Sequence, residues 1–179
     1  MKELVQNRDL SIRTYDLGDH RILIEGFLTD HRYRPRGDEG SEEAGRLVHD
    51  MIVRLRVRGP SLLIEEATAE MPHHPREECP EVLPWIRRLE GMMIATGFTM
   101  KVKEIIGETK GCSHLTSLVI AMGPAAVQGY WAAYGVESSR MSLGEEAVRK
   151  VINTCYLWRE DGPLVERLRR ALKDQTPAK

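Results

Sequence analysis

Residues 46–71 read RLVHDMIVRLRVRGPSLLIEEATAEM, and this stretch decides the fold. In its first half, apolar side chains alternate with basic ones. The apolar residues are Val53, Leu55 and Val57, and the basic ones are Arg54, Arg56 and Arg58. Because successive side chains of a strand point to opposite faces of a sheet, the alternation predicts a strand over residues 46–58 with one buried face and one basic face.

The second half of the stretch predicts the partner strand. Gly59-Pro60-Ser61 has the composition of a turn, and residues 62–71 continue as LLIEEATAEM. Together the two segments predict an antiparallel hairpin. Glu66 and Glu70 are expected to face the arginines, since opposite charges on facing strands attract each other. The basic face is then a paired, solvated sheet face, and its alternative is a surface that binds anions.

Two further strands are predicted upstream, over residues 9–15 and 20–30, with Leu17-Gly18-Asp19 as the turn between them. Gly26 interrupts an apolar face of the second strand, which indicates either a bulge or a close approach of another backbone. Residues 33–45 are polar and rich in glycine, and they predict a loop before the hairpin.

Downstream of the hairpin the apolar spacing changes from that of strands to that of helices. Pro80 suits the first turn of a helix, and residues 98–106 fit a short helix better than a strand. The apolar residues of 115–122 recur at the spacing of one helix face and predict a third helix. Gly123-Pro124 is expected to break or kink it, because proline lacks the backbone N–H and clashes with the preceding turn.

Two more helices are predicted near the C-terminus. Ser142 and Glu145 form a capping box, which opens a helix to about Trp158 that carries Cys155 on its core side. The last amphipathic helix has Leu164, Val165, Leu168 and Leu172 on its apolar face.

The order of these elements predicts the fold class. Strands come first and helices follow, which indicates an α+β fold with an antiparallel sheet in the N-terminal half packed against a helical C-terminal half. The chain has 179 residues, a length that suits one domain. We expect a single domain over residues 1–179, with a sheet portion over about 9–72 and a helical portion over about 80–173.

Composition and charge argue against several classes of partner. Lys plus Arg is 26 and Asp plus Glu is 27. A net charge of -1 does not attract a polyanion, so no nucleic acid is expected as a partner. No apolar run approaches the ~18 residues that span a bilayer, and the N-terminal residues show no signal-peptide core. A cytoplasmic protein is expected. The three cysteines lie far apart in the sequence and are expected to be reduced.

One stretch combines glycines, a cysteine next to a histidine-containing turn, and the start of a predicted helix. Residues 107–122 read GETKGCSHLTSLVIAM, so Cys112, Ser113 and His114 enter a helix directly after a polar, Gly-rich turn. The first N–H groups of a helix lack partners and carry partial positive charge, which makes a thiol placed there a better nucleophile or metal ligand. Cys112 and His114, with Asp30 at the end of its strand, are the candidate catalytic residues.

A metal site is the alternative use of the same residues. Cys79, Cys112 and His114 are candidate ligands of zinc or iron, with further donors available from Asp30, His31, His73 or His74. The spacing is not that of a CxxC pair, and each residue also has a structural explanation. Cys112 suits a small buried position at a tight helix start, His114 can bond a backbone carbonyl, and Asp30 can form a turn.

Several of these segments carry a resemblance to a known family. They are TDHR at 29–32, AEMPHHP at 69–75, Cys79, and GCSHL at 111–115. With them the chain resembles the bacterial proteins of the DUF2889 family, a domain of unknown function, over roughly residues 10–135. The resemblance supports the choice of site residues and a single domain, and it implies no particular reaction. The order of a small sheet followed by helices is also loosely similar to that of iron–sulfur scaffold proteins.

Two functional classes remain open at this point. The first is an enzyme acting on a small molecule, or a metal-binding protein, with a Cys/His/Asp pocket at the Gly111-Cys112 helix start. The second is a non-catalytic module that binds a ligand or a partner protein and whose GCSHL turn is structural. Both allow a small-molecule ligand and a homo-oligomer. Four residues from three segments, Asp30, Cys79, Cys112 and His114, are predicted to converge in one pocket.

Overall fold

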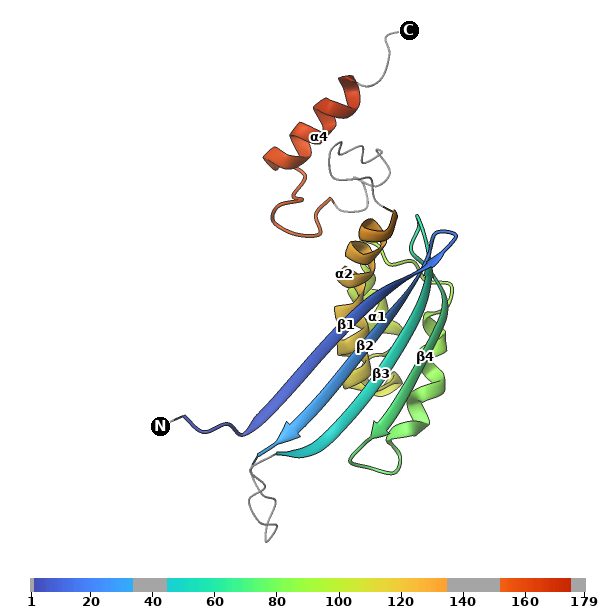
Figure 1. Ribbon diagram of the computed structural model, residues 1–179, viewed down its shortest axis with the longest axis vertical. Coiled ribbons are helices and arrows are strands. Elements are labelled where there is room, and N and C mark those ends of the chain that lie inside the picture. The colour runs from blue at the N-terminus through green and yellow to red at the C-terminus, as the bar shows by residue number, and fades with distance from the viewer. Residues whose placement is uncertain (1, 34–44, 135–151, 175–179) are drawn as a thin grey trace.

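The computed structural model describes residues 2–33, 45–134 and 152–174. Its N-terminal half is a four-stranded antiparallel sheet in the order β1-β2-β3-β4. The helix α2 packs against β1, β2 and β3, η1 packs against β4, and α1 packs on α2 and η1 (Figure 1). The predicted α+β fold is therefore confirmed. The elements are β1 (Gln6–Gly18), β2 (Arg21–Arg32), β3 (Arg46–Arg58), β4 (Leu63–His73), η1 (Cys79–Leu89), α1 (Phe98–Ile106), η2 (Glu108–Lys110), α2 (Ser113–Tyr134) and α4 (Pro163–Asp174).

The four strands form hairpins with their neighbours along the chain. β3 and β4 pair antiparallel, with Val53 opposite Ala69, which confirms the predicted hairpin. β1 and β2 are longer than predicted, so the turn between them is Asp19-His20 rather than Leu17-Gly18-Asp19. Asp19 and His20 have φ angles of 49° and 57°, the left-handed conformation used by two-residue turns that match the twist of the flanking strands. The predicted loop at 33–45 lies almost wholly outside the described residues.

The two faces of the sheet differ as the alternation predicts. One face is the core, and its fully buried residues include Ile22, Ile24, Leu28, Val53, Leu55 and Val57. On the other face Arg54 binds Glu25 at 2.8 Å and also contacts Glu70, while Arg56 binds Glu66 at 2.8 Å. The predicted pairing of Glu66 and Glu70 with the arginines is confirmed, so this face is a paired, solvated surface.

The helix α2 crosses the core face above β1 and β2. A Cβ atom added to Gly26 of β2 would lie 2.7 Å from Sδ of Met122, and one added to Gly129 of α2 would lie 2.3 Å from Cγ2 of Thr14. Gly26 is in regular register opposite Ile12 and Val53, so it does not mark a bulge, and the close approach at this position is by side chains of α2 rather than by another backbone. Because the glycines allow α2 to pack directly on the sheet, they set the position of its N-terminus relative to the strands.

The helical half departs from the expectations in two ways. The segment after β4 is the 3₁₀ helix η1, which buries Ile86 and Leu89, whereas α1 forms as predicted. The expected break at Gly123-Pro124 is absent, because α2 runs from Ser113 to Tyr134. Met122 and Ala126 on either side of the proline are fully buried, and we infer that this packing outweighs the local cost of the proline.

The C-terminal predictions have mixed outcomes. The Ser142 capping box lies outside the described residues. Residues 152–158 form turns, so the predicted helix does not extend to Trp158. Cys155 lies in these turns and is exposed, which contradicts its predicted place in the core. The last helix is confirmed as α4, with Val165 and Leu168 buried.

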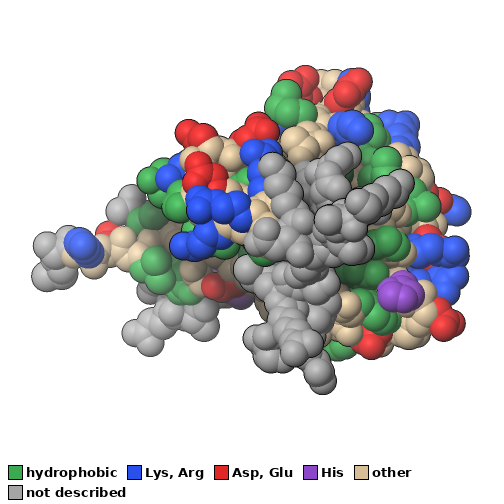
Figure 2. All heavy atoms as spheres, turned by 90° about the horizontal axis from the view of Figure 1, so that it is seen from above, with side chains coloured by type: hydrophobic (Ala, Val, Ile, Leu, Met, Phe, Trp, Pro, Cys, Tyr) green, Lys and Arg blue, Asp and Glu red, His purple; other side chains and the backbone are tan. Residues whose placement is uncertain are grey.

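Seen from the end of the molecule that lies at the top of Figure 1, described Lys and Arg side chains are interspersed with Asp and Glu rather than gathered into one basic patch (Figure 2). Within the described residues, no helix has the length and apolar character needed to cross a membrane.

Candidate functional site

Three elements meet where α2 begins over the end of the sheet. Asp30 lies near the end of β2, His49 lies opposite it on β3, and His114 is the second residue of α2. Their potential ligand atoms all lie within 4.8 Å of one another, and no other group of this kind occurs in the described part of the chain. The site thus joins residues that are up to 84 positions apart, from 30 to 114.

Strand alternation brings Asp30 and His49 to the core face. Asp30 continues the buried stripe of Leu28 on β2, and His49 continues that of Met51 on β3. The register shifts beside this pair, because Asp30 is opposite His49 while His31 is opposite Leu47, which leaves Val48 as an extra residue of β3. Bulges of this type redirect side chains near the end of a strand. Both polar side chains therefore lie at the boundary between the apolar core and solvent.

Asp30 is a buried carboxylate that is held from two sides. Its side chain is 4% exposed. Nε and Nη2 of Arg8 donate hydrogen bonds to Oδ1 and Oδ2, each at 2.7 Å, and Nδ1 of His49 is 2.8 Å from Oδ2. The hydrogen bonds from Arg8 lower the pKa of Asp30 to about 2, and His49 acts in the same direction against the effect of burial. Asp30 is therefore ionised at neutral pH.

His114 completes the cluster from the helix side. Its Nε2 is 3.8 Å from Oδ2 of Asp30, and its ring centroid is 4.0 Å from that of His49. Burial lowers the pKa of His114, and the nearby His49 and Arg8 add to this effect, whereas Asp30 opposes it. The imidazole is consequently neutral at pH 7, the form that can accept a proton or bind a metal ion.

Cys112 lies next to His114 on the side away from Asp30. Its Sγ is 3.5 Å from Nδ1 of His114. The hydroxyl of Thr116 lies 2.9 Å from the carbonyl oxygen of Cys112 and 2.8 Å from that of Ile106, which ties the start of α2 to the end of α1. A Cβ atom on Gly111 would lie 2.2 Å from the same Ile106 oxygen. The backbone therefore approaches Gly111 closely, and this contact fixes the turn that presents Cys112 and His114.

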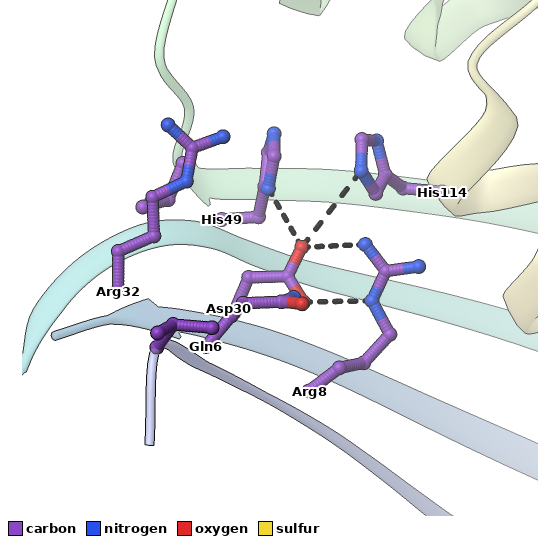
Figure 3. A pocket seen from close by; sticks show the side chains of 8 residues that line it. Gln6, Arg8, Asp30, Arg32, His49 and His114 are labelled. Atoms are coloured by element: carbon purple, nitrogen blue, oxygen red, sulfur yellow. Dashed lines mark hydrogen bonds and ion pairs between the residues drawn. The ribbon is translucent and has the colours of Figure 1, made fainter. Parts of the chain in front are cut away.

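The cluster opens into a small pocket with a volume of about 270 Å³. Asp30, His49 and His114 face one another within it, and Arg8 reaches Asp30 from β1 (Figure 3). Arg32, Gln6, Val5 and Val48 form the rest of the lining. A reagent or ligand can therefore reach the two histidines from solvent.

The structure brings some of the candidate residues together and leaves others apart. Asp30 and His114 are in the cluster, and Cys112 adjoins it. Cys79 begins η1 and packs half-buried against the core, outside the cluster and the pocket lining. The three histidines that were alternative donors lie outside the cluster, since His31 is opposite Leu47 on β3, His73 ends β4 and His74 binds the carbonyl of Arg76.

Sequence reasoning missed two residues of the site, His49 and Arg8. His49 lies within the predicted strand 46–58, and its pattern there gave attention to the apolar and basic residues only. A signal was nevertheless present, because His49 has the same parity as Met51 and Val53, and a histidine on a buried strand face requires a polar partner. Arg8 preceded the predicted limits of the first strand, so its pairing with Asp30 could not be expected.

Two histidines and one carboxylate around an open pocket can support two kinds of chemistry. Such a set binds divalent zinc or iron while leaving coordination positions free for water or a substrate. Without a metal, a carboxylate next to an imidazole can orient it as a general base. The Cys112–His114 contact adds the elements of an activated thiol.

Neither a curated protein nor a solved structure gives a significant match. The family described as "Protein of unknown function (DUF2889)" matches residues 6–128, which include Arg8, Asp30, His49 and His114. This match extends over more than half of the 179 residues. The chain therefore belongs to the DUF2889 family.

Proposed function

We propose that the protein binds one divalent transition metal ion, zinc or iron, through Asp30, His49 and His114, and that the ion faces the pocket. The observation that carries the proposal is the convergence of these three side chains from β2, β3 and α2. In a structural zinc site, four protein ligands normally close the coordination sphere. Three ligands beside an open pocket are typical of a site at which the metal contacts a small molecule.

The distances suit an ion after small side-chain movements. Metal bonds of about 2.0–2.2 Å place neighbouring ligand atoms roughly 3–3.5 Å apart in a tetrahedral site. Oδ2 of Asp30 is 2.8 Å from Nδ1 of His49 and 3.8 Å from Nε2 of His114, values on either side of that range. Arg8 would remain on the carboxylate as the outer partner that fixes its orientation.

The competing explanation is a structural network in a non-catalytic binding module. No buried side-chain nitrogen or oxygen among the described residues lacks a hydrogen-bond partner, so the Arg8–Asp30–His49 contacts are complete without an ion. This explanation accounts for Arg8 and Asp30. It gives no reason for a neutral histidine, His114, held 3.8 Å from the same carboxylate without a hydrogen bond to it.

The first test is a metal titration of the whole chain. Protein treated with EDTA and then freed of the chelator is titrated with Zn²⁺, and separately with Fe²⁺ without oxygen, in a calorimeter. We expect one equivalent of at least one ion to bind to the wild-type protein. Cys155→Ser removes an exposed thiol outside the site and should bind the ion like the wild type. Absence of binding by both ions would support the structural network instead.

A second candidate function rests on the Cys112 thiol. Sγ of Cys112, the ring of His114 and Oδ2 of Asp30 follow one another at 3.5 and 3.8 Å, the order of groups that activates a thiol nucleophile. If Cys112 acts in this way, iodoacetamide should modify it at pH 7 faster than the exposed Cys155, and His114→Ala should remove the difference. Mass spectrometry of both peptides measures the rates. A Cys112 that reacts more slowly than Cys155 would assign it a packing role.

A further inference from the structure

Of the two guanidinium groups that line the described pocket, one has an acidic partner and the other, on Arg32, has none among residues 2–33, 45–134 and 152–174. Among the described residues, the side chain of Arg32 makes no ion pair and no hydrogen bond, although it lines the pocket. By contrast, Arg8 is matched by Asp30, and Arg54 on the outer face of the sheet is matched by Glu25. Figure 3 shows the Arg32 guanidinium on the same side of the sheet as the rings of His49 and His114.

This arrangement gives the pocket a positive charge. The charges of Arg8 and Asp30 cancel at 2.7 Å, so among the described lining residues the charge of Arg32 is left unbalanced. A bound divalent ion would add two further positive charges. A guanidinium offers planar, paired donors that match the two oxygens of a carboxylate, and a metal ion attracts the same group. The preferred ligand of such a pocket is an anion.

The lining residues and the volume of the pocket limit which anions can bind there. Val5 and Val48 supply apolar surface beside the charged groups. The volume is about 270 Å³, whereas a water molecule occupies about 30 Å³ in the liquid. The space corresponds to roughly nine water molecules and therefore suits a small molecule with a charged end and a short apolar portion.

We propose that the ligand of this site is a short aliphatic carboxylate, held between Arg32 and the metal ion with its carbon chain against Val5 and Val48. The inference rests on the proposed metal site and adds to it the class of molecule that the metal contacts. Arg32 is the residue that selects for a negative charge. A cation of the same size should be excluded by the unbalanced charge.

The test uses butyrate as the probe and calorimetry of the zinc-loaded full chain as the readout. Wild-type protein should bind butyrate, and Arg32→Ala should weaken that binding about 10- to 100-fold, as expected for the loss of a charge-assisted hydrogen bond. Arg32→Lys keeps the charge but loses the paired donors, so its affinity should be intermediate. Arg13→Ala is the matched control, because Arg13 stacks on Phe27 on the opposite face of the sheet.

Zinc binding is measured separately for each variant, so the two proposals fail in different ways. If zinc binds to wild type and Arg32→Ala alike but butyrate binds to neither, the metal site stands and the carboxylate inference is wrong. Equal binding of butyrate by Arg32→Ala and wild type, equal binding of butylamine and butyrate, or Arg32-dependent binding of inorganic phosphate without butyrate would each overturn the inference. If the wild type binds no zinc, the proposed function itself is wrong.

Discussion

His114→Ala is expected to weaken zinc binding by more than about 100-fold, beyond the 10- to 100-fold that is typical of losing an outer partner of a metal ligand. The substitution removes one of three proposed ligands. It leaves the network of Arg8, Asp30 and His49 intact, because Nε2 of His114 lies 3.8 Å from Asp30 and makes no hydrogen bond to it. Competition between the protein and a fluorescent zinc chelator measures the change in affinity.

The control for this variant is His74→Ala. His74 is half-buried, and its Nδ1 bonds the nearby carbonyl of Arg76. It lies outside the cluster and the pocket lining, so its loss removes an imidazole without touching the site. This control should bind zinc like the wild type. An unchanged zinc affinity of His114→Ala, with urea unfolding showing a normal fold, would remove His114 from the ligand set.

Asp30→Asn is expected to lower the free energy of unfolding by about 2–3 kcal/mol at pH 7, measured with EDTA present so that metal binding makes no contribution. The physical reason is the pKa of Asp30, which is about 2 in the folded protein and near 3.8 in an unfolded chain. A difference of this size corresponds to about 2.5 kcal/mol. The amide keeps the shape of the carboxylate but loses its charge, so Arg8 and His49 lose their ionic partner.

The pH dependence of this effect has a defined sign. Because the folded pKa of Asp30 is depressed, its contribution is complete above about pH 4 and is lost as the pH falls toward 2. The difference in unfolding free energy between wild type and Asp30→Asn should therefore shrink over that window. Asp9→Asn makes the same chemical change at an exposed position of β1 and should have little effect at any pH. A difference that stays constant from pH 7 to pH 2.5 would contradict the electrostatic explanation.

The fold could be predicted largely because its strands obey a simple rule. Val53, Leu55 and Val57 are buried while Arg54 and Arg56 pair with glutamates, as the alternation of strand side chains requires. The predicted break at Gly123-Pro124 is wrong, because a local preference does not decide the structure there. There a local preference against helix was outweighed by burial of Met122 and Ala126, which the sequence spacing alone does not measure.

The site was predicted only in part. Asp30 and His114 lie at the ends of a predicted strand and a predicted helix, where functional side chains are often found, and the structure places them in one cluster. His49 lies inside a strand, and its meeting with Asp30 depends on the register and on the bulge at Val48, neither of which is encoded in a local pattern. Two cysteines were predicted wrongly in the opposite direction. The spacing of Cys155 predicted a place on the core side of a helix, but Cys155 is exposed. Cys79 was a candidate ligand only because a thiol can bind a metal, and it lies outside the cluster.

The most direct test of the central claim is an anomalous diffraction map, collected at the zinc absorption edge, from crystals of the full chain grown with Zn²⁺. We predict one peak at about 2.0–2.2 Å from a carboxylate oxygen of Asp30 and from one ring nitrogen of each of His49 and His114. A peak held by Cys79 or Cys112 without these three residues, or no peak in the pocket, would contradict the account.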